Sequence, residues 1–258
     1  MKKKKQFQKR KIIMILFIIS LSILIFLNIH DLKKEIFMRE NEIATIQTSG
    51  GKGNTIPQPK NEPEINSKIT DWNLILVNKE HLIPNGYNPE VQMIENGYRV
   101  DKRIVEAIEK MLKDARSEGM NPWICSSYRS SETQVKLFQN QVNKYINQGY
   151  GSKKAEEMAA SWVAIPRTSE HEIGLSLDIV DREYQLLDEE QANRPTQKWL
   201  KENCTKYGFI LRYEEDKQDK TKVNHEPWHY RYVGIENAKF MKEKEFCLEE
   251  FIEYLKDR

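Results

Sequence analysis

Two short segments of the chain contain two histidines, an aspartate and a glutamate, the residue types of a catalytic zinc site. His171 and Asp178 lie in the segment 169–178, and Glu226 and His229 lie within four residues of one another. Catalytic zinc usually takes three nitrogen or oxygen ligands from the protein and keeps a fourth position for water. We therefore predict that His171, Asp178 and His229 bind Zn²⁺, and that Glu226 stays free to act as a base.

The first segment leads into residues 175–180, a run of aliphatic and β-branched residues that is typical of a β-strand. Side chains alternate along a strand, so Leu175, Leu177 and Ile179 would share the core face. Asp178 would then point away from that core, toward the opposite face of the sheet.

The second segment also predicts a strand. Pro227 discourages a helix, so residues 228–233 are expected to be extended, with His229 and Arg231 on one face. If the two strands pair, His229 becomes a cross-strand neighbour of Asp178. The other histidine, upstream of the first strand, would complete the ligand set.

These residues also resemble a known family. The pattern Ser-x-His-x-x-Gly-x-small-x-Asp, followed by Glu-x-Trp-His, is similar to that of the VanY-type D-alanyl-D-alanine carboxypeptidases, zinc peptidases of the peptidase M15 group. The resemblance extends to residues 127–130 and 207–213 and runs from about Trp72 to the C-terminus. Two departures are Ser176, where the family usually has Ala, and His225, where relatives often carry Tyr. The resemblance implies an α+β fold with zinc as the cofactor.

The resemblance implies a hydrolase that cleaves peptide bonds of peptidoglycan stems. Zinc would lower the pKa of a water molecule toward neutrality. Glu226 would take that proton as general base and later give it to the leaving amine. Arg129 would stabilise the oxyanion or hold a substrate carboxylate. A purely structural Arg129, capping a helix or pairing with Glu132, is the alternative.

Three further polar residues are candidates for substrate binding. Ser127 and Ser169 would donate hydrogen bonds to the terminal carboxylate of the substrate. Gln134 has two interpretations, because residues 131–134 fit a helix capping box, whereas the resemblance places Gln134 at the edge of the substrate.

The leading functional hypothesis is a D,D-carboxypeptidase that removes the terminal D-Ala from a stem ending in D-Ala-D-Ala. The alternative is an L,D-carboxypeptidase acting on the tetrapeptide stem; residues 145–167 should discriminate the two. A catalytically inactive wall-binding module is disfavoured, because zinc binding alone requires neither Glu226 nor Arg129. A wall-lysing endopeptidase is disfavoured by the membrane anchor described next.

The N-terminus predicts a membrane anchor. Residues 1–11 are a basic cytoplasmic segment, and residues 12–29 are apolar except for two serines and an asparagine. Roughly eighteen residues at about 1.5 Å each nearly span a hydrocarbon core of ~30 Å. No small-residue cleavage site follows, and a nucleic-acid-binding tail would not precede so apolar a run. We predict a single-pass signal anchor in the cell membrane, with the catalytic domain extracellular.

Composition divides the remaining chain into a stalk and a domain. Residues 30–70 are expected to be an extracellular linker, because residues 48–70 are rich in glycine and proline and lack apolar periodicity. Residues 71–258 are expected to form one α+β domain, a small antiparallel sheet that carries the zinc site and is flanked by helices. We expect strands at 71–77, 123–127 and 209–213 besides those above. We expect helices at 101–117, 153–164, 196–207, 236–242 and 247–256, and one with Val135, Phe138, Val142 and Ile146 on its inner face.

The cysteines Cys125, Cys204 and Cys247 are odd in number and have no C-x-x-C spacing. We expect Cys204 and Cys247 to be buried as small hydrophobic residues rather than to bind metal or form a disulfide.

Overall fold

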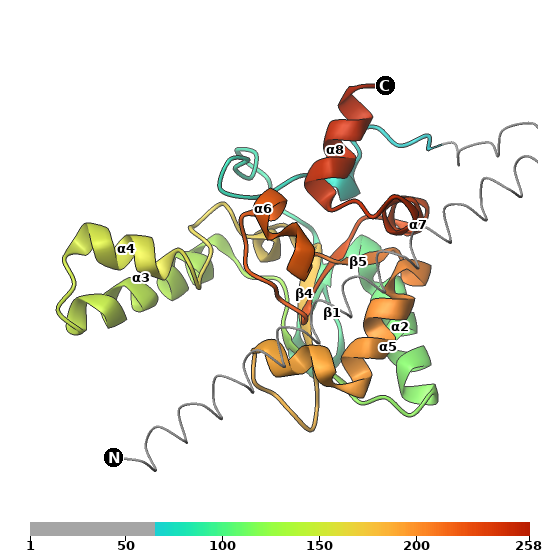
Figure 1. The fold of residues 1–258 in the computed structure, drawn as a ribbon, viewed down its shortest axis with the longest axis horizontal. Helices are drawn as coiled ribbons and strands as arrows, with labels where there is room; N and C mark the ends of the chain where they lie inside the picture. Colours follow the sequence, from blue (N-terminus) through green and yellow to red (C-terminus); the bar gives the residue numbers. More distant parts are fainter. Residues whose placement is uncertain (1–64) are drawn as a thin grey trace, which may run out of the picture. The chain divides into compact units, whose positions relative to one another are not determined.

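The computed structural model describes residues 65–258, which belong to one compact unit (Figure 1). The predicted anchor at 12–29, the basic segment before it and most of the predicted stalk lie outside the described residues. Within residues 65–258, no helix is both long enough and apolar enough to span a bilayer.

The described domain is built on a four-stranded antiparallel sheet with the strand order β3-β4-β6-β5. Its strands are β3 (Pro122–Ser126), β4 (Ser176–Asp181), β5 (Phe209–Leu211) and β6 (His229–Tyr232). A separate two-stranded sheet pairs β1 (Val91–Met93) with β2 (Arg99–Asp101), which the sequence did not predict. The α+β architecture with a small antiparallel sheet is confirmed.

The central strand β4 follows the predicted alternation. Leu175, Leu177 and Ile179 are fully buried in the main apolar core. Every residue of β4 is buried, so the opposite face, which carries Asp178, is covered as well. The strand is thus enclosed on both sides, and its one carboxylate in mid-strand needs polar partners.

Two helices lie side by side against this core (Figure 1). Helix α2 (Val105–Ser117) buries its apolar positions at helical spacing, and a left-handed Gly119 (φ 82°) follows its end as predicted. Helix α5 (Pro195–Asn203) begins with proline at its first position, where no backbone donor is lost. A 3₁₀ turn, Cys204–Tyr207, then leads to Gly208 and β5.

Helices α3 (Ser131–Asn147) and α4 (Ser152–Ala159) form a hairpin that projects from the sheet (Figure 1). The predicted inner face of α3 is only partly right, because Val142 is buried while Val135 is 49% exposed and Ile146 is 40% exposed. A projecting helix packs only where its hairpin partner covers it. Helix α4 also ends five residues earlier than predicted.

The C-terminal part packs as a second apolar cluster. Helices α7 (Ile235–Lys244) and α8 (Leu248–Lys256) contribute most of it, and a short helix, α6 (Gln218–Thr221), contacts α8. The predicted extended segment at 71–77 is instead a 3₁₀ turn, Trp72–Leu74, followed by irregular chain that buries Val77. Cys204 and Cys247 are buried and unpaired, as predicted.

Candidate metal centre

The turn before β4 sets the position of His171. Residues Glu170–Ile173 form a 3₁₀ turn that ends at Gly174, which has a left-handed conformation (φ 72°). A Cβ on this glycine would meet the backbone nitrogen of Asp101 at 3.0 Å, and the Asp101 amide donates to the Gly174 carbonyl at 2.9 Å. Glycine is therefore required both for the turn and for the close approach of the chain.

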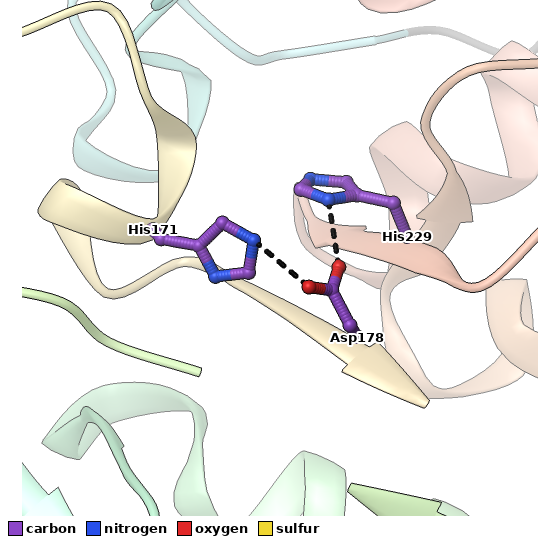
Figure 2. A group of neighbouring side chains, drawn as sticks. All are labelled: His171, Asp178 and His229. Carbon is purple, nitrogen blue, oxygen red and sulfur yellow. Dashed lines mark hydrogen bonds and ion pairs between the residues drawn. The ribbon is translucent and has the colours of Figure 1, made fainter. Parts of the chain in front are cut away.

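The strand pairing brings the other two predicted ligands together. Asp178 and His229 are direct cross-strand partners between β4 and β6, as predicted. Asp178 lies between the two imidazoles (Figure 2), with His171 Nε2 at 3.3 Å from Oδ2 and His229 Nδ1 at 3.0 Å from Oδ1. All three side chains are buried. Segments far apart in the sequence thus place three ligand-type atoms at one point.

Hydrogen bonds on the far side of each ring determine which nitrogen faces Asp178. His171 Nδ1 lies 2.8 Å from the Ser127 carbonyl oxygen, which can only accept, so Nδ1 donates and Nε2 keeps its lone pair. His229 Nε2 lies 3.3 Å from Glu170 Oε2. The two histidines therefore turn opposite nitrogens, Nε2 and Nδ1, toward the shared aspartate.

This donor set fits zinc. At Zn–N and Zn–O distances of ~2.0–2.1 Å, tetrahedral ligand atoms lie ~3.4 Å apart. The two histidine–aspartate separations are close to that value, and the ligand atoms of His171, Asp178 and His229 all lie within 4.8 Å of one another. Neutral imidazole and carboxylate are the ligands expected of a catalytic zinc centre.

The charges of the cluster are strongly coupled. Burial opposes ionisation of Asp178, but the two histidines outweigh it and hold the pKa of its carboxyl group well below the usual range. Burial also opposes the charged form of His229, yet the carboxylates of Asp178 and Glu170 raise its pKa to about 9. The metal-free site thus favours a proton on His229 that a metal ion would displace, so metal affinity should increase with pH.

Glu226 lies beside the cluster without joining it. Its Oε2 is 3.7 Å from His229 Nδ1, and its side chain is 29% exposed. The Glu226 amide donates to the Tyr213 carbonyl at 3.1 Å and its own carbonyl accepts from the His229 amide at 3.1 Å, which fixes the short link between them. Burial raises the pKa of Glu226 to about 7. These features suit a proton acceptor near neutral pH; the role of general base stays a prediction.

Arg129 presents an incompletely paired cation at the same place. Its amide donates to the His171 carbonyl at 3.1 Å, and its Nη1 donates to Gln134 Oε1 at 2.8 Å. Its buried Nε has no partner, and no ion pair links it to Glu132 within residues 65–258. Burial lowers the pKa of this guanidinium. A partly buried cation with an unused donor can bind an anionic oxygen.

Gln134 has a role that neither interpretation of the sequence included. The helix N-cap is Ser130, whose hydroxyl accepts from the Thr133 amide, so the capping box predicted over 131–134 is wrong. Gln134 is fully buried and bridges Arg129 to the Ala164 carbonyl, with Nε2 donating at 2.6 Å. It thereby fixes the guanidinium and the loop after α4.

The two candidate serines are both buried next to the metal cluster. Ser127 Oγ accepts from the Arg99 amide at 3.2 Å, and its carbonyl orients His171. Ser169 is the residue before the 3₁₀ turn, and its side chain makes no capping hydrogen bond. Their contact with substrate stays a prediction. His225, left out of the ligand set, pairs instead with Glu189 at 2.7 Å.

Sequence reasoning missed Glu170, which is fully buried beside His229. Its Oε1 accepts from Arg212 Nε and Arg231 Nη1, each at 2.8 Å. Two arginines on predicted strands of a small domain were the available signal, because a buried guanidinium requires a carboxylate partner.

Comparison with known proteins places this geometry in a family. The sequence profile of the VanY family, described as D-alanyl-D-alanine carboxypeptidase, matches residues 97–235. A D-alanyl-D-alanine carboxypeptidase of Enterococcus faecalis is 40% identical over 183 residues, which cover 70% of this chain and 66% of the relative.

Solved structures share the fold. The vancomycin-resistance D,D-pentapeptidase VanY, solved as a mutant in complex with Zn(II), matches with a TM-score of 0.63 and 41% identity, over 70% of this chain and 99% of that one. The LD-carboxypeptidase LdcB matches with a TM-score of 0.60 and 35% identity, over 70% of this chain and 86% of that one.

Proposed function

Because this chain belongs to the VanY family of zinc-dependent D-alanyl-D-alanine carboxypeptidases, we propose that it removes the terminal D-Ala from peptidoglycan stems that end in D-Ala-D-Ala. The observation that carries the proposal is the meeting of His171, Asp178 and His229 beside a free carboxylate, Glu226. Zinc binding alone would require only the first three residues.

The chain's own groups account for the proton transfers of hydrolysis. When bound, zinc supplies Lewis acidity that makes water nucleophilic near neutral pH. Glu226 accepts the proton that this water loses as its oxygen bonds to the scissile carbonyl carbon. The same carboxyl group then donates that proton to the nitrogen of the departing D-Ala as the C–N bond breaks.

Arg129 supplies the positive charge that the reaction needs. Within the described residues its guanidinium forms no ion pair and donates one side-chain hydrogen bond, to Gln134, so its charge is free to bind the developing oxyanion or the terminal carboxylate of the substrate. Gln134 holds the guanidinium at 2.8 Å and prevents it from turning away. Ser127 and Ser169 would add donors for the same carboxylate.

We also propose that residues 12–29 anchor this domain to the outer side of the cell membrane, with residues 30–70 as a stalk. The support is the apolar run after a basic cluster, and the glycine- and proline-rich stretch after it. A tethered enzyme would act on peptidoglycan close to the membrane. Membrane fractionation, with and without residues 1–30, tests this part separately from catalysis.

An L,D-carboxypeptidase acting on the tetrapeptide stem is the second candidate. The observation that favours it is the 35% identity to the LD-carboxypeptidase LdcB, which shares the fold. The metal ligands and base would serve either reaction, because both hydrolyse a peptide bond next to a terminal D-Ala.

Digestion of defined stem peptides separates the two candidates. The full-length protein is incubated with pentapeptide and tetrapeptide stems in parallel, and the products are identified by mass spectrometry. The Glu226→Gln variant controls for contaminating peptidases. Loss of alanine from the pentapeptide supports the proposal, whereas loss from the tetrapeptide alone would replace it with the L,D activity. Inertness toward both would refute each.

A further inference from the structure

A buried carboxylate, that of Glu170, contacts the metal cluster through the ring nitrogen of His229 that faces away from Asp178. Glu170 has a fully buried side chain, and its two oxygens have different partners. Oε1 accepts from Arg212 and Arg231, and Oε2 lies 3.3 Å from His229 Nε2. One carboxylate thus joins two guanidinium groups to a predicted zinc ligand.

The two arginines are themselves fixed from other parts of the domain. Arg212 also donates through both terminal nitrogens to Glu249 in α8, at 2.9 and 2.7 Å. Arg231 donates through Nη2 to the carbonyls of Asn73 and Ile75, at 3.1 and 2.8 Å. Both guanidinium groups are fully buried. Glu170 is therefore held by groups that cannot easily rearrange.

This arrangement determines the orientation of the His229 ring. In the metal-free site both ring nitrogens face a carboxylate, Asp178 at Nδ1 and Glu170 at Nε2. When a metal ion takes Nδ1, the Glu170 carboxylate, which only accepts hydrogen bonds, keeps the proton on Nε2. A metal-binding histidine is commonly oriented in this way by a hydrogen bond on its other nitrogen. The ring of His171 is oriented in the same way by a neutral acceptor, the carbonyl oxygen of Ser127.

Stability alone gives little reason to keep such a network. Buried ion pairs often contribute no more than well-packed apolar residues of similar size, because desolvation offsets their attraction. The network has two carboxylates and two guanidinium groups, so its charges balance without any contact to His229. The contact of Glu170 Oε2 with the histidine is thus an additional feature.

We propose that Glu170 is a positioning residue for the metal centre: held by Arg212 and Arg231, it fixes the tautomer and the ring orientation of His229 for zinc binding. The inference rests on the zinc site of the proposed function.

Two isosteric variants of the full-length protein separate positioning from folding. Glu170→Gln and Glu249→Gln each remove one carboxylate from Arg212, but only Glu170 touches His229. Zinc affinity is measured by competition with a chromophoric chelator, the visible spectrum is recorded with Co²⁺ in place of zinc, and the melting temperature is measured without metal.

We expect Glu170→Gln to weaken zinc binding about 10- to 100-fold, the usual effect of losing such a partner, and to change the Co²⁺ spectrum. Glu249→Gln should also lower the metal-free melting temperature but keep the wild-type affinity and spectrum. Equal zinc affinities for wild type and Glu170→Gln would overturn the inference. The inference would also be overturned if zinc affinity fell in both variants in proportion to the fall in their metal-free melting temperatures.

Nitrogen NMR of the wild-type histidines keeps the inference testable if Glu170→Gln does not fold. In the zinc-loaded protein, His229 should retain its proton on Nε2, and His171 should retain its proton on Nδ1. A His229 protonated on Nδ1 and bound through Nε2 would overturn the inference. Wild-type protein that binds no zinc at these histidines would instead refute the proposed function.

Discussion

Replacement of the predicted base, Glu226→Gln, separates catalysis from metal binding. Glutamine has the same shape as glutamate, so the change removes the charge without leaving a cavity. The Glu226 side chain is 29% exposed, so the new amide can also contact water. Its Oε2 lies 3.7 Å from His229 Nδ1, so the carboxylate is beside the metal position but is not one of the predicted ligands. Metal content should therefore survive the change while proton transfer is lost.

The expected size of the effect follows from that role. A positioned general base contributes about 10²- to 10⁴-fold to the rate, which is about 2.7–5.5 kcal/mol of activation free energy. The metal-free stability of the variant, unlike its activity, should not fall. Because burial raises the pKa of Glu226 to about 7, the folded protein disfavours its ionised form, so a neutral glutamine should leave metal-free stability above pH 7 unchanged or higher.

The assay is kcat/KM for release of D-Ala from the pentapeptide, together with zinc content by elemental analysis. Glu189→Gln is the matched control, because this side chain is 73% exposed and pairs with the neighbouring His225. It should change kcat/KM by no more than about twofold, since exposed pairs contribute little. A Glu226→Gln variant that keeps more than about a tenth of the activity would refute the reasoning about the base. Loss of zinc in proportion to activity would do so too.

Three further changes test other parts of the account. Because the base must be ionised, kcat/KM should increase with pH. Burial places the metal-free pKa of Glu226 at about 7, and the positive charge of bound zinc would favour the carboxylate, so the midpoint of the acidic limb should lie below 7. A limb centred above 7 would contradict this assignment. Arg129→Ala should lower kcat/KM about 10²- to 10³-fold with zinc retained, as for removal of an oxyanion donor; steady-state kinetics that change less than tenfold would show that the guanidinium contacts no reacting group. Leu177→Ala, at a fully buried position, should lower the free energy of unfolding by about 2–5 kcal/mol in denaturant titration, and a loss below 1 kcal/mol would argue against the described core.

The sequence predicted the pairing of Asp178 with His229 because the signals there are local and strong. Aliphatic alternation defines β4, and Pro227 rules out a helix before β6. Since side chains alternate along a strand, strand identity and register decide which residues meet across the sheet. Predicting the ligand cluster required little more than the identity of these two strands and their register.

The projecting hairpin was predicted less well, since an apolar period does not say how much of a helix is covered. Val135 and Val142 both occupy the apolar stripe of α3, yet only Val142 packs against α4. The early end of α4 has a similar cause: residues 160–164 turn back toward Gln134, whose side chain binds the Ala164 carbonyl. These are tertiary contacts without a local signal.

Glu170 shows why supporting residues are hard to find from sequence alone. It lies between Ser169 and His171, inside the motif, at a position where the pattern leaves the residue open. Its partners Arg212 and Arg231 are about forty and sixty residues away. Only the fold reveals that the three charges are buried together.

The central claim is that His171, Asp178 and His229 bind one zinc ion. A crystal structure with anomalous scattering recorded on both sides of the zinc absorption edge tests it most directly. We expect a single strong peak ~2.0–2.2 Å from His171 Nε2, an Asp178 carboxylate oxygen and His229 Nδ1. A peak held by other residues, or fully active protein with no peak between these three side chains, would contradict it.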